Sequence, residues 1–142
     1  MDGFQNAGAD EGTLWIADLD ESRLVPIFNS GPESESFVDK FRQPLDRGVV
    51  SMVFHSGQPF CENEVFKNSG HDDTVDKELG QVTAAMIALP LFFAHEPRGV
   101  ISCVKLGDGE FDVPDLNTMQ HAGVVLERLL DWSLLRAVTD LD

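Results

Sequence analysis

Cysteine is scarce in this chain, which contains only Cys61 and Cys103. The two residues are far apart in the sequence, so they form neither a disulfide framework nor a Cys-x-x-Cys redox motif. We therefore expect two reduced thiols, as in a cytosolic protein, with one bridge in a secreted protein as the alternative. Tyrosine is absent, and the aromatic residues are ten Phe and two Trp.

Long hydrophobic runs are lacking as well. The longest apolar stretch covers residues 84–94 and is interrupted by Pro90, so it is much shorter than the roughly 20 residues that a transmembrane helix needs. The first twelve residues contain no basic segment followed by an apolar run, as a secretory signal would. We expect a soluble, cytoplasmic protein that does not bind membranes.

Basic residues are few, because ten Lys and Arg stand against 25 Asp and Glu, for a formal net charge of −15. A field of this sign repels phosphate backbones and anionic lipids, so we expect no nucleic-acid or membrane partner. One small anion in a local pocket stays compatible with this charge, because salt limits surface fields to about 8 Å.

The motifs of common catalytic and metal sites are also missing. The sequence has no Gly-x-Ser-x-Gly, no P-loop and no dinucleotide fingerprint. Seven side chains of metal-ligand type follow one another at spacings that match no zinc or iron motif: His55, Cys61, Glu62, Glu64, His71, Asp72 and Asp73. The acidic runs at 18–22 and 108–112 lack the calcium-loop pattern. We expect neither a metal site nor an enzyme, and a small redox enzyme that uses His55, Cys61 and Cys103 is the less favoured alternative.

Apolar alternation predicts two antiparallel hairpins. The first joins residues 12–18 to residues 23–29, with a bulge or an edge position at Pro26. The second joins residues 84–94 to residues 99–106, with a bulge near Pro90. Its first strand is apolar on both faces, which is typical of a central strand covered on both sides.

Helical periodicity and capping residues predict the helices. The expected segments are a short helix at 33–41, a helix at 48–57 that ends at Gly57, a short helix at 72–79, and a long helix at 113–138. Asp112 and Asp115 form an acidic variant of a capping box at the start of the long helix. The apolar stripe of this last helix is wider than one sheet face needs.

Three stretches, in this order along the chain, resemble the GAF domain family. The first is Gly57 and Pro59 followed by Asn63-Glu64-Val65, where the family commonly has Asn-Asp-Val. The second is Leu89-Pro90-Leu91 with Gly99-Val100-Ile101, similar to the family's Val-Pro-Leu strand and the Gly-Val-Ile that follows its turn. The third is Phe111, Asp115 and Leu116, similar to the Phe-x-x-x-Asp-Leu that opens the family's last helix. The resemblance covers about residues 12–135, and PAS and profilin-like sensor folds are the alternatives.

The resemblance implies an α+β fold with a central antiparallel sheet of five to six strands, helices on both sides, and a long C-terminal helix. It places one domain at residues 12–138, between a flexible N-terminus at 1–11 and a tail at 139–142. Many family members have a helix before the first strand; here only a short polar stretch precedes Gly12, so we expect that this helix is either missing or was cut away. The domain is either free-standing or part of a larger sensor.

Three ligand-specific subsets of the family match poorly. In the cyclic-nucleotide phosphodiesterase subset, only Phe111 and Asp115 of the characteristic residues are present, with Lys105 and Leu106 at the Asn-Lys places and Leu116 at the Glu place. The cysteine that attaches a bilin in phytochrome-like members is missing, and two distant cysteines do not supply the cluster of the methionine-sulfoxide reductases. The cofactor is therefore unknown.

The function implied is that of a sensory or regulatory domain that binds a small molecule and signals through its last helix. The pocket is expected between the central sheet and a cover formed by residues 58–83, as a mostly apolar cavity with a few polar groups. The predicted ligand-binding residues are Phe54, Phe60, Asn63, Glu64, Phe66, His71, Thr83, Met86 and Cys103. We also expect a homodimer through the C-terminal helix. A structural dimerisation module with no ligand is the alternative function.

Overall fold

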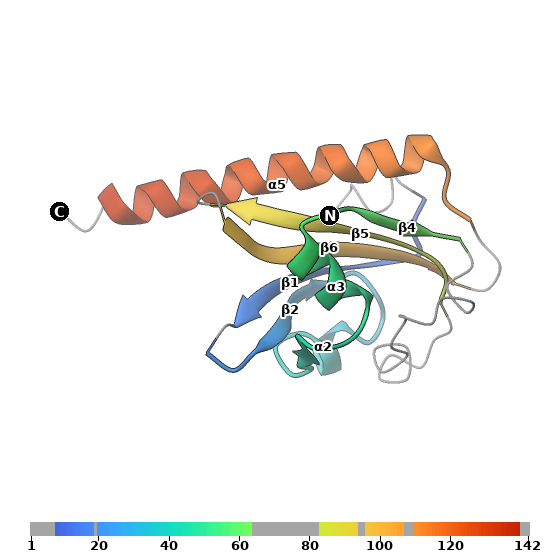
Figure 1. The fold of residues 1–142 in the computed structure, drawn as a ribbon, viewed down its shortest axis with the longest axis horizontal. Helices are drawn as coiled ribbons and strands as arrows, with labels where there is room; N and C mark the ends of the chain where they lie inside the picture. The colour runs from blue at the N-terminus through green and yellow to red at the C-terminus, as the bar shows by residue number, and fades with distance from the viewer. Residues whose placement is uncertain (1–7, 19, 64–82, 94–95, 107–109, 140–142) are drawn as a thin grey trace.

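One six-stranded antiparallel sheet organises the chain in the computed structural model, in the order β3-β2-β1-β6-β5-β4 (Figure 1). The structure describes residues 8–18, 20–63, 83–93, 96–106 and 110–139. Its elements are β1 (Glu11–Asp18), β2 (Arg23–Asn29), α2 (Ser34–Phe37), β3 (Gln43–Pro44), α3 (Val49–Ser56), β4 (Phe60–Glu62), β5 (Thr83–Phe93), β6 (Glu96–Leu106) and α5 (Val113–Thr139). Helices α2 and α3 lie on one side of the sheet and α5 on the other. The predicted α+β fold is confirmed. The helix expected at 72–79 lies outside the described residues.

The first predicted hairpin is confirmed as β1 and β2. Trp15 lies opposite Pro26, and the register shifts between Leu14 and Trp15, so the predicted irregularity at Pro26 is present. β3 pairs with β2 only at Arg23 and Leu24. Pro26 therefore lies beyond the paired residues of this neighbour, where its missing N–H interrupts no bond to β3.

The short helix predicted at 33–41 is wrong at its C-terminal end, because α2 ends at Phe37. Val38 is extended and Asp39 has a φ of 65°, in the left-handed region that Asp tolerates better than most residues. In this conformation the Asp39 N–H donates to the Pro26 carbonyl at 2.8 Å. The chain then turns back, and the Phe41 ring stacks on Phe37 with centroids 5.2 Å apart. The bend thus keeps both rings together without a helix.

The next helix, α3, is confirmed with its predicted end. Gly57 follows it in the left-handed conformation, and the Gly57 N–H donates to the Val53 carbonyl. A glycine takes this conformation without the steric cost that a Cβ brings.

The second predicted hairpin is confirmed as β5 and β6, and alternate side chains of β5 enter the core on each face. In the described part of the chain, β4 pairs with β5 only from Met86 to Ala88. Pro90 lies beyond these pairs, so its missing N–H costs no bond to β4. The register shift expected near Pro90 falls between Leu91 and Phe92. The Phe92 N–H donates to the Glu127 carboxylate of α5 at 3.1 Å.

Helix α5 begins with the predicted acidic capping box. The Asp112 N–H donates to the Asp115 carboxylate and the Asp115 N–H donates to the Asp112 carboxylate, both at 3.0 Å. The last turns of α5 extend past the end of β5 (Figure 1). None of the helices described is both long and apolar enough to cross a membrane.

Substituting Gly123 by Ala should stabilise the protein. Gly123 is buried in α5, and a Cβ there would lie 3.9–4.0 Å from the side chains of Leu89, Ile101 and Leu91, an ordinary contact distance. Because glycine inside a helix costs about 1 kcal/mol relative to alanine, we expect urea unfolding to show a gain of about 1 kcal/mol. Gly99→Ala is the contrasting variant, since its Cβ would overlap the Trp15 carbonyl oxygen and should destabilise. A loss of stability in Gly123→Ala would show that α5 packs too tightly for a methyl group.

Candidate functional site

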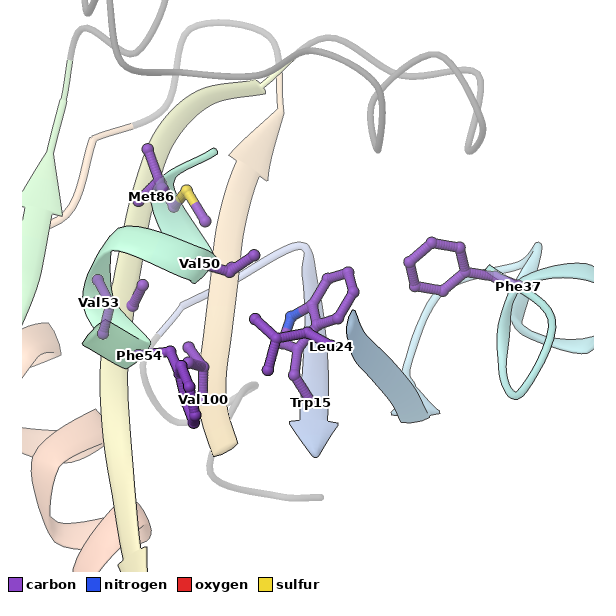
Figure 2. Close-up of a cluster of buried hydrophobic side chains, with 10 residues drawn as sticks. Trp15, Leu24, Phe37, Val50, Val53, Phe54, Met86 and Val100 are labelled. Atoms are coloured by element: carbon purple, nitrogen blue, oxygen red, sulfur yellow. The ribbon is translucent and has the colours of Figure 1, made fainter. Parts of the chain in front are cut away.

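The sheet face beneath α2 and α3 is filled by aromatic rings over β1 and β2. Trp15 is buried and makes edge-to-face contacts with Phe37 and Phe41, at centroid distances of 5.7 and 6.3 Å. The buried Leu24 of β2 belongs to the same cluster (Figure 2). Around Trp15, this half of the face is a packed core.

The other half of this face lies over β5 and β6 and carries three of the predicted ligand-binding residues. Phe54 of α3 and Met86 of β5 are buried in the same cluster, and the half-buried Phe60 of β4 packs against it. Figure 2 shows Phe54 near Val100, with Met86 farther along β5. Residues from α3, β4 and β5 are thus brought to one sheet face.

A row of buried polar side chains crosses the same face. Asn29, Thr13 and Ser102 lie opposite one another on β2, β1 and β6, and each is 5–6% exposed. The Asn29 side-chain amide donates to Thr13 Oγ1, and Trp15 Nε1 donates to Ser102 Oγ, both at 2.9 Å. Glu11, 5% exposed, lies two residues before Thr13 on β1, and so on the same face. Sequence analysis did not identify this row. Its one local signal is the alternation of Glu11, Thr13 and Trp15.

Cys103 lies on the opposite face of the sheet from Phe54, Phe60 and Met86. It is buried in the cluster beneath α5 with Ile87 and Met119. Burial, followed by the nearby Cys61 and Asp115, raises the pKa of the Cys103 thiol to about 12. The structure therefore does not bring Cys103 together with the other predicted residues.

The two cysteines are aligned across the sheet but are not neighbours. Cys61 lies opposite Ile87 of β5, which lies opposite Cys103 of β6. Two strand spacings separate their Cα atoms by about 10 Å, beyond the roughly 7 Å limit for a disulfide. His55 belongs to α3 on the other face and contacts the Leu45 carbonyl. The arrangement does not bring the three residues of the redox-enzyme alternative into one cleft.

Asn63, a predicted ligand-binding residue, is bonded to the start of α5. Its side-chain amide donates to the Phe111 carbonyl at 2.9 Å, and its side-chain oxygen accepts from the Phe111 N–H at 2.8 Å. Thr83 is the first residue of β5, and its side chain is not described. Glu64, Phe66 and His71 lie outside the described residues. Among the residues that are described, His, Cys, Asp and Glu form no group of three that could hold a metal ion.

The two thiols should differ strongly in reactivity. Cys61 is exposed, but partial burial and then Glu62 and Asp115 raise the pKa of its thiol. Because the thiolate is the reactive form, a disulfide reagent should modify Cys61 slowly at pH 7 and faster as pH rises, and should spare Cys103. One thiol per folded chain and two in guanidinium are the expected counts.

Cys61→Ser provides the control, since it should leave no reactive thiol in the folded protein. The raised pKa also predicts a pH effect on stability. Burial favours the neutral Cys103 thiol in the folded state. Its contribution to the free energy of unfolding is therefore complete below the pKa of the unfolded chain, about 8.5, and is lost as pH rises toward 12. Equal labelling rates for Cys61 and Cys103 would contradict the burial of Cys103.

Comparison with known sequences identifies relatives for part of the chain. No protein-family model matches the sequence. The cone cGMP-specific 3′,5′-cyclic phosphodiesterase subunit alpha′ of Bos taurus is 37% identical over 111 residues, which are 75% of this chain and 12% of that protein. The subunit of the same name from Mus musculus is 32% identical over 98 residues, 66% of this chain and 11% of that protein. The chain thus spans about an eighth of the length of these relatives. Both relatives are phosphodiesterase subunits, although the sequence has only Phe111 and Asp115 of the residues described above as characteristic of the cyclic-nucleotide phosphodiesterase subset.

Solved structures share the fold over most of the chain. The GAF domain of a phosphoenolpyruvate-protein phosphotransferase from Coxiella burnetii has a TM-score of 0.82 at 16% identity, covering 95% of this chain and 79% of that one. The GAF-B domain of DevS from Mycobacterium smegmatis has a TM-score of 0.73 at 15% identity, covering 99% and 92%. A free methionine-R-sulfoxide reductase from Neisseria meningitidis has a TM-score of 0.70 at 21% identity, covering 85% and 66%. The strand order, the sequence motifs and these likenesses together assign the chain to the GAF domain family.

Proposed function

We propose that this GAF domain is a sensory or regulatory module that binds a small molecule against the sheet face beneath α2 and α3. The binding region is bordered by Phe54, Phe60 and Met86, and α5 on the other face carries the output. The observation that carries the proposal is the row of buried polar side chains on this otherwise apolar face, namely Asn29, Thr13 and Ser102, with Glu11 beside it.

Buried polar groups on a sheet face are costly unless hydrogen bonds compensate them. Ser102 Oγ accepts from Trp15 and Thr13 Oγ1 accepts from Asn29, which leaves both hydroxyl groups able to donate. The Glu11 carboxylate beside them is an acceptor. An apolar wall with a few placed donors and acceptors is the usual composition of a small-ligand site. A heterocyclic ring with its own N–H donors and ring acceptors fits this composition.

Cyclic GMP is the first compound to test, because relatives of the chain are cGMP-specific phosphodiesterase subunits. A thermal-shift screen should include cyclic AMP, free purines, amino acids and haem beside it. A ligand present at 100 times its Kd stabilises the folded state by about 2.7 kcal/mol, which is a shift of several degrees in Tm for a domain of this size.

Two variants separate binding at this face from general effects on stability. Ser102→Ala removes a hydroxyl from the polar row, whereas Ser36→Ala removes one that donates to the Glu33 carbonyl on an exposed part of α2. We expect the compound-induced shift to be kept in Ser36→Ala and reduced in Ser102→Ala, with each variant compared with its own ligand-free Tm. The absence of a shift with every compound, or an undiminished shift in Ser102→Ala, would count against the proposed face.

A second role, dimerisation through α5, is favoured by exposed apolar residues on that helix. Val124, Val125 and Leu129 are 43%, 43% and 60% exposed. A second copy of the chain would cover them in a two-fold arrangement. Light scattering should then show a dimer at micromolar concentration and a monomer for Leu129→Glu. A wild-type monomer would remove this role without affecting ligand binding.

A further inference from the structure

The edge strand β4 has side chains on both faces of the sheet. Phe60 packs against the cluster beneath α3, whereas Cys61 lies in the same cross-strand row as Ile87 and Cys103, which belong to the cluster beneath α5. β4 is only three residues long and pairs with β5 alone among the described strands. Among the described strands, only the two-residue β3 is shorter. Few backbone hydrogen bonds therefore oppose a small displacement of β4.

Asn63 continues directly from β4 and holds the residue that leads into α5. The side-chain amide and oxygen of Asn63 bond to both backbone groups of Phe111, across 48 positions of sequence. Phe111 cannot shift independently of the core, because its ring is buried beneath α5 and Lys105 Nζ lies 5.3 Å from the ring centroid. Phe111 precedes the capping box of α5 by one residue. The Asn63 side chain thus connects the residue that follows β4 to the residue that leads into α5.

A second side-chain bond holds α5 farther along its length. Glu127 accepts the backbone N–H of Phe92 at 3.1 Å, near the C-terminal end of β5. With the helix held at Glu127, a displacement of Phe111 changes the angle of α5 against the sheet rather than sliding the whole helix.

We propose that Asn63 is a positioning residue that transmits displacement of β4 to α5. The proposal deepens the proposed function, since Phe60 borders the proposed binding face and Asn63 directly follows the other end of the same short strand. A ligand that pushes on Phe60 moves β4, and the paired hydrogen bonds of Asn63 carry that movement to Phe111. A carboxamide is suited to this role because it donates and accepts at once, whereas Asp accepts only.

The test is a double-mutant cycle read by hydrogen exchange, and it needs no ligand. Phe60→Ala perturbs the binding-face end of β4, and Asn63→Asp removes the donor to the Phe111 carbonyl with little change of volume. Amide exchange of Phe111 and of the first two turns of α5 is measured in the wild type, both single variants and the double variant. Asn117→Ala is the matched control, because Asn117 lies exposed on α5.

Transmission through Asn63 predicts that Phe60→Ala speeds exchange in the first turn of α5 by about tenfold, and that this effect disappears in the Asn63→Asp background. Asn117→Ala should leave Phe111 exchange unchanged. Additive effects of the two substitutions, or no effect of Phe60→Ala on α5, would overturn the proposal. Asn63→Ser serves in place of Asn63→Asp if the carboxylate prevents folding. A negative ligand screen together with a non-additive cycle would reject ligand binding and support the coupling through Asn63. A positive ligand screen together with an additive cycle would support ligand binding and reject the coupling.

Discussion

Replacing Trp15 by Ala should lower the free energy of unfolding by about 3–5 kcal/mol, the range for truncation of a large buried aromatic residue. Trp15 is 1% exposed at the junction of the two halves of the α2/α3 face, and its ring contacts Phe37 and Phe41. Truncation leaves a cavity that the short helix α2 fills only partly. Urea unfolding followed by far-UV circular dichroism measures the loss without relying on tryptophan emission.

The indole N–H and the indole ring should contribute separately. Trp15→Phe keeps most of the ring and removes the donor to Ser102, while Ser102→Ala removes the acceptor and leaves the buried N–H unpaired. Leaving a buried donor unpaired costs about 1–3 kcal/mol, so each of these variants should lose less than Trp15→Ala. A Trp15→Ala variant as stable as the wild type would contradict the packing of this half of the face.

Replacing Met119 by Ala should lower the free energy of unfolding by about 2–5 kcal/mol. Met119 is fully buried where α5 crosses the sheet, in one cluster with Ile87, Leu89 and Ile101. The loss should be accompanied by faster hydrogen exchange along α5, because apolar packing holds this helix on the sheet between the Asn63–Phe111 bond before its start and the Phe92–Glu127 bond farther along.

Met52→Ala provides the matched control for Met119→Ala. Met52 is 47% exposed on α3, so the same substitution removes little buried surface and should change stability by less than about 0.5 kcal/mol. Similar losses of stability in both variants would show that the burial of Met119 beneath α5 does not cause the loss.

The local parts of the fold could be predicted because their signals lie within a few residues. The capping pair Asp112 and Asp115, the helix stop at Gly57 and the two hairpins each depend on neighbouring residues, and the structure confirms them. The end of α2 could not be predicted, because the left-handed Asp39 is fixed by a bond to Pro26 on a different element.

The composition of the candidate site depends on register and was only partly predictable. Phe54, Phe60 and Met86 could be chosen for their apolar character near the expected pocket. The polar row could not, because Thr13 meets Ser102 only when the first strand pairs with the sixth. The same register places Cys103 beneath α5, since its neighbour Ser102 takes the other face. Contacts across 87 positions of sequence, as between Trp15 and Ser102, have no local signature.

A native mass spectrum tests most directly whether the α2/α3 face holds a small molecule. Protein purified without denaturation should carry a non-covalent adduct that is released by unfolding. The same adduct should be lost from Ala88→Leu, whose larger side chain would occupy the face between Met86 and Ser102. A bare mass for the wild type, both as purified and after incubation with every compound of the screen, would contradict the binding role. An adduct equally abundant in Ala88→Leu would place the ligand elsewhere.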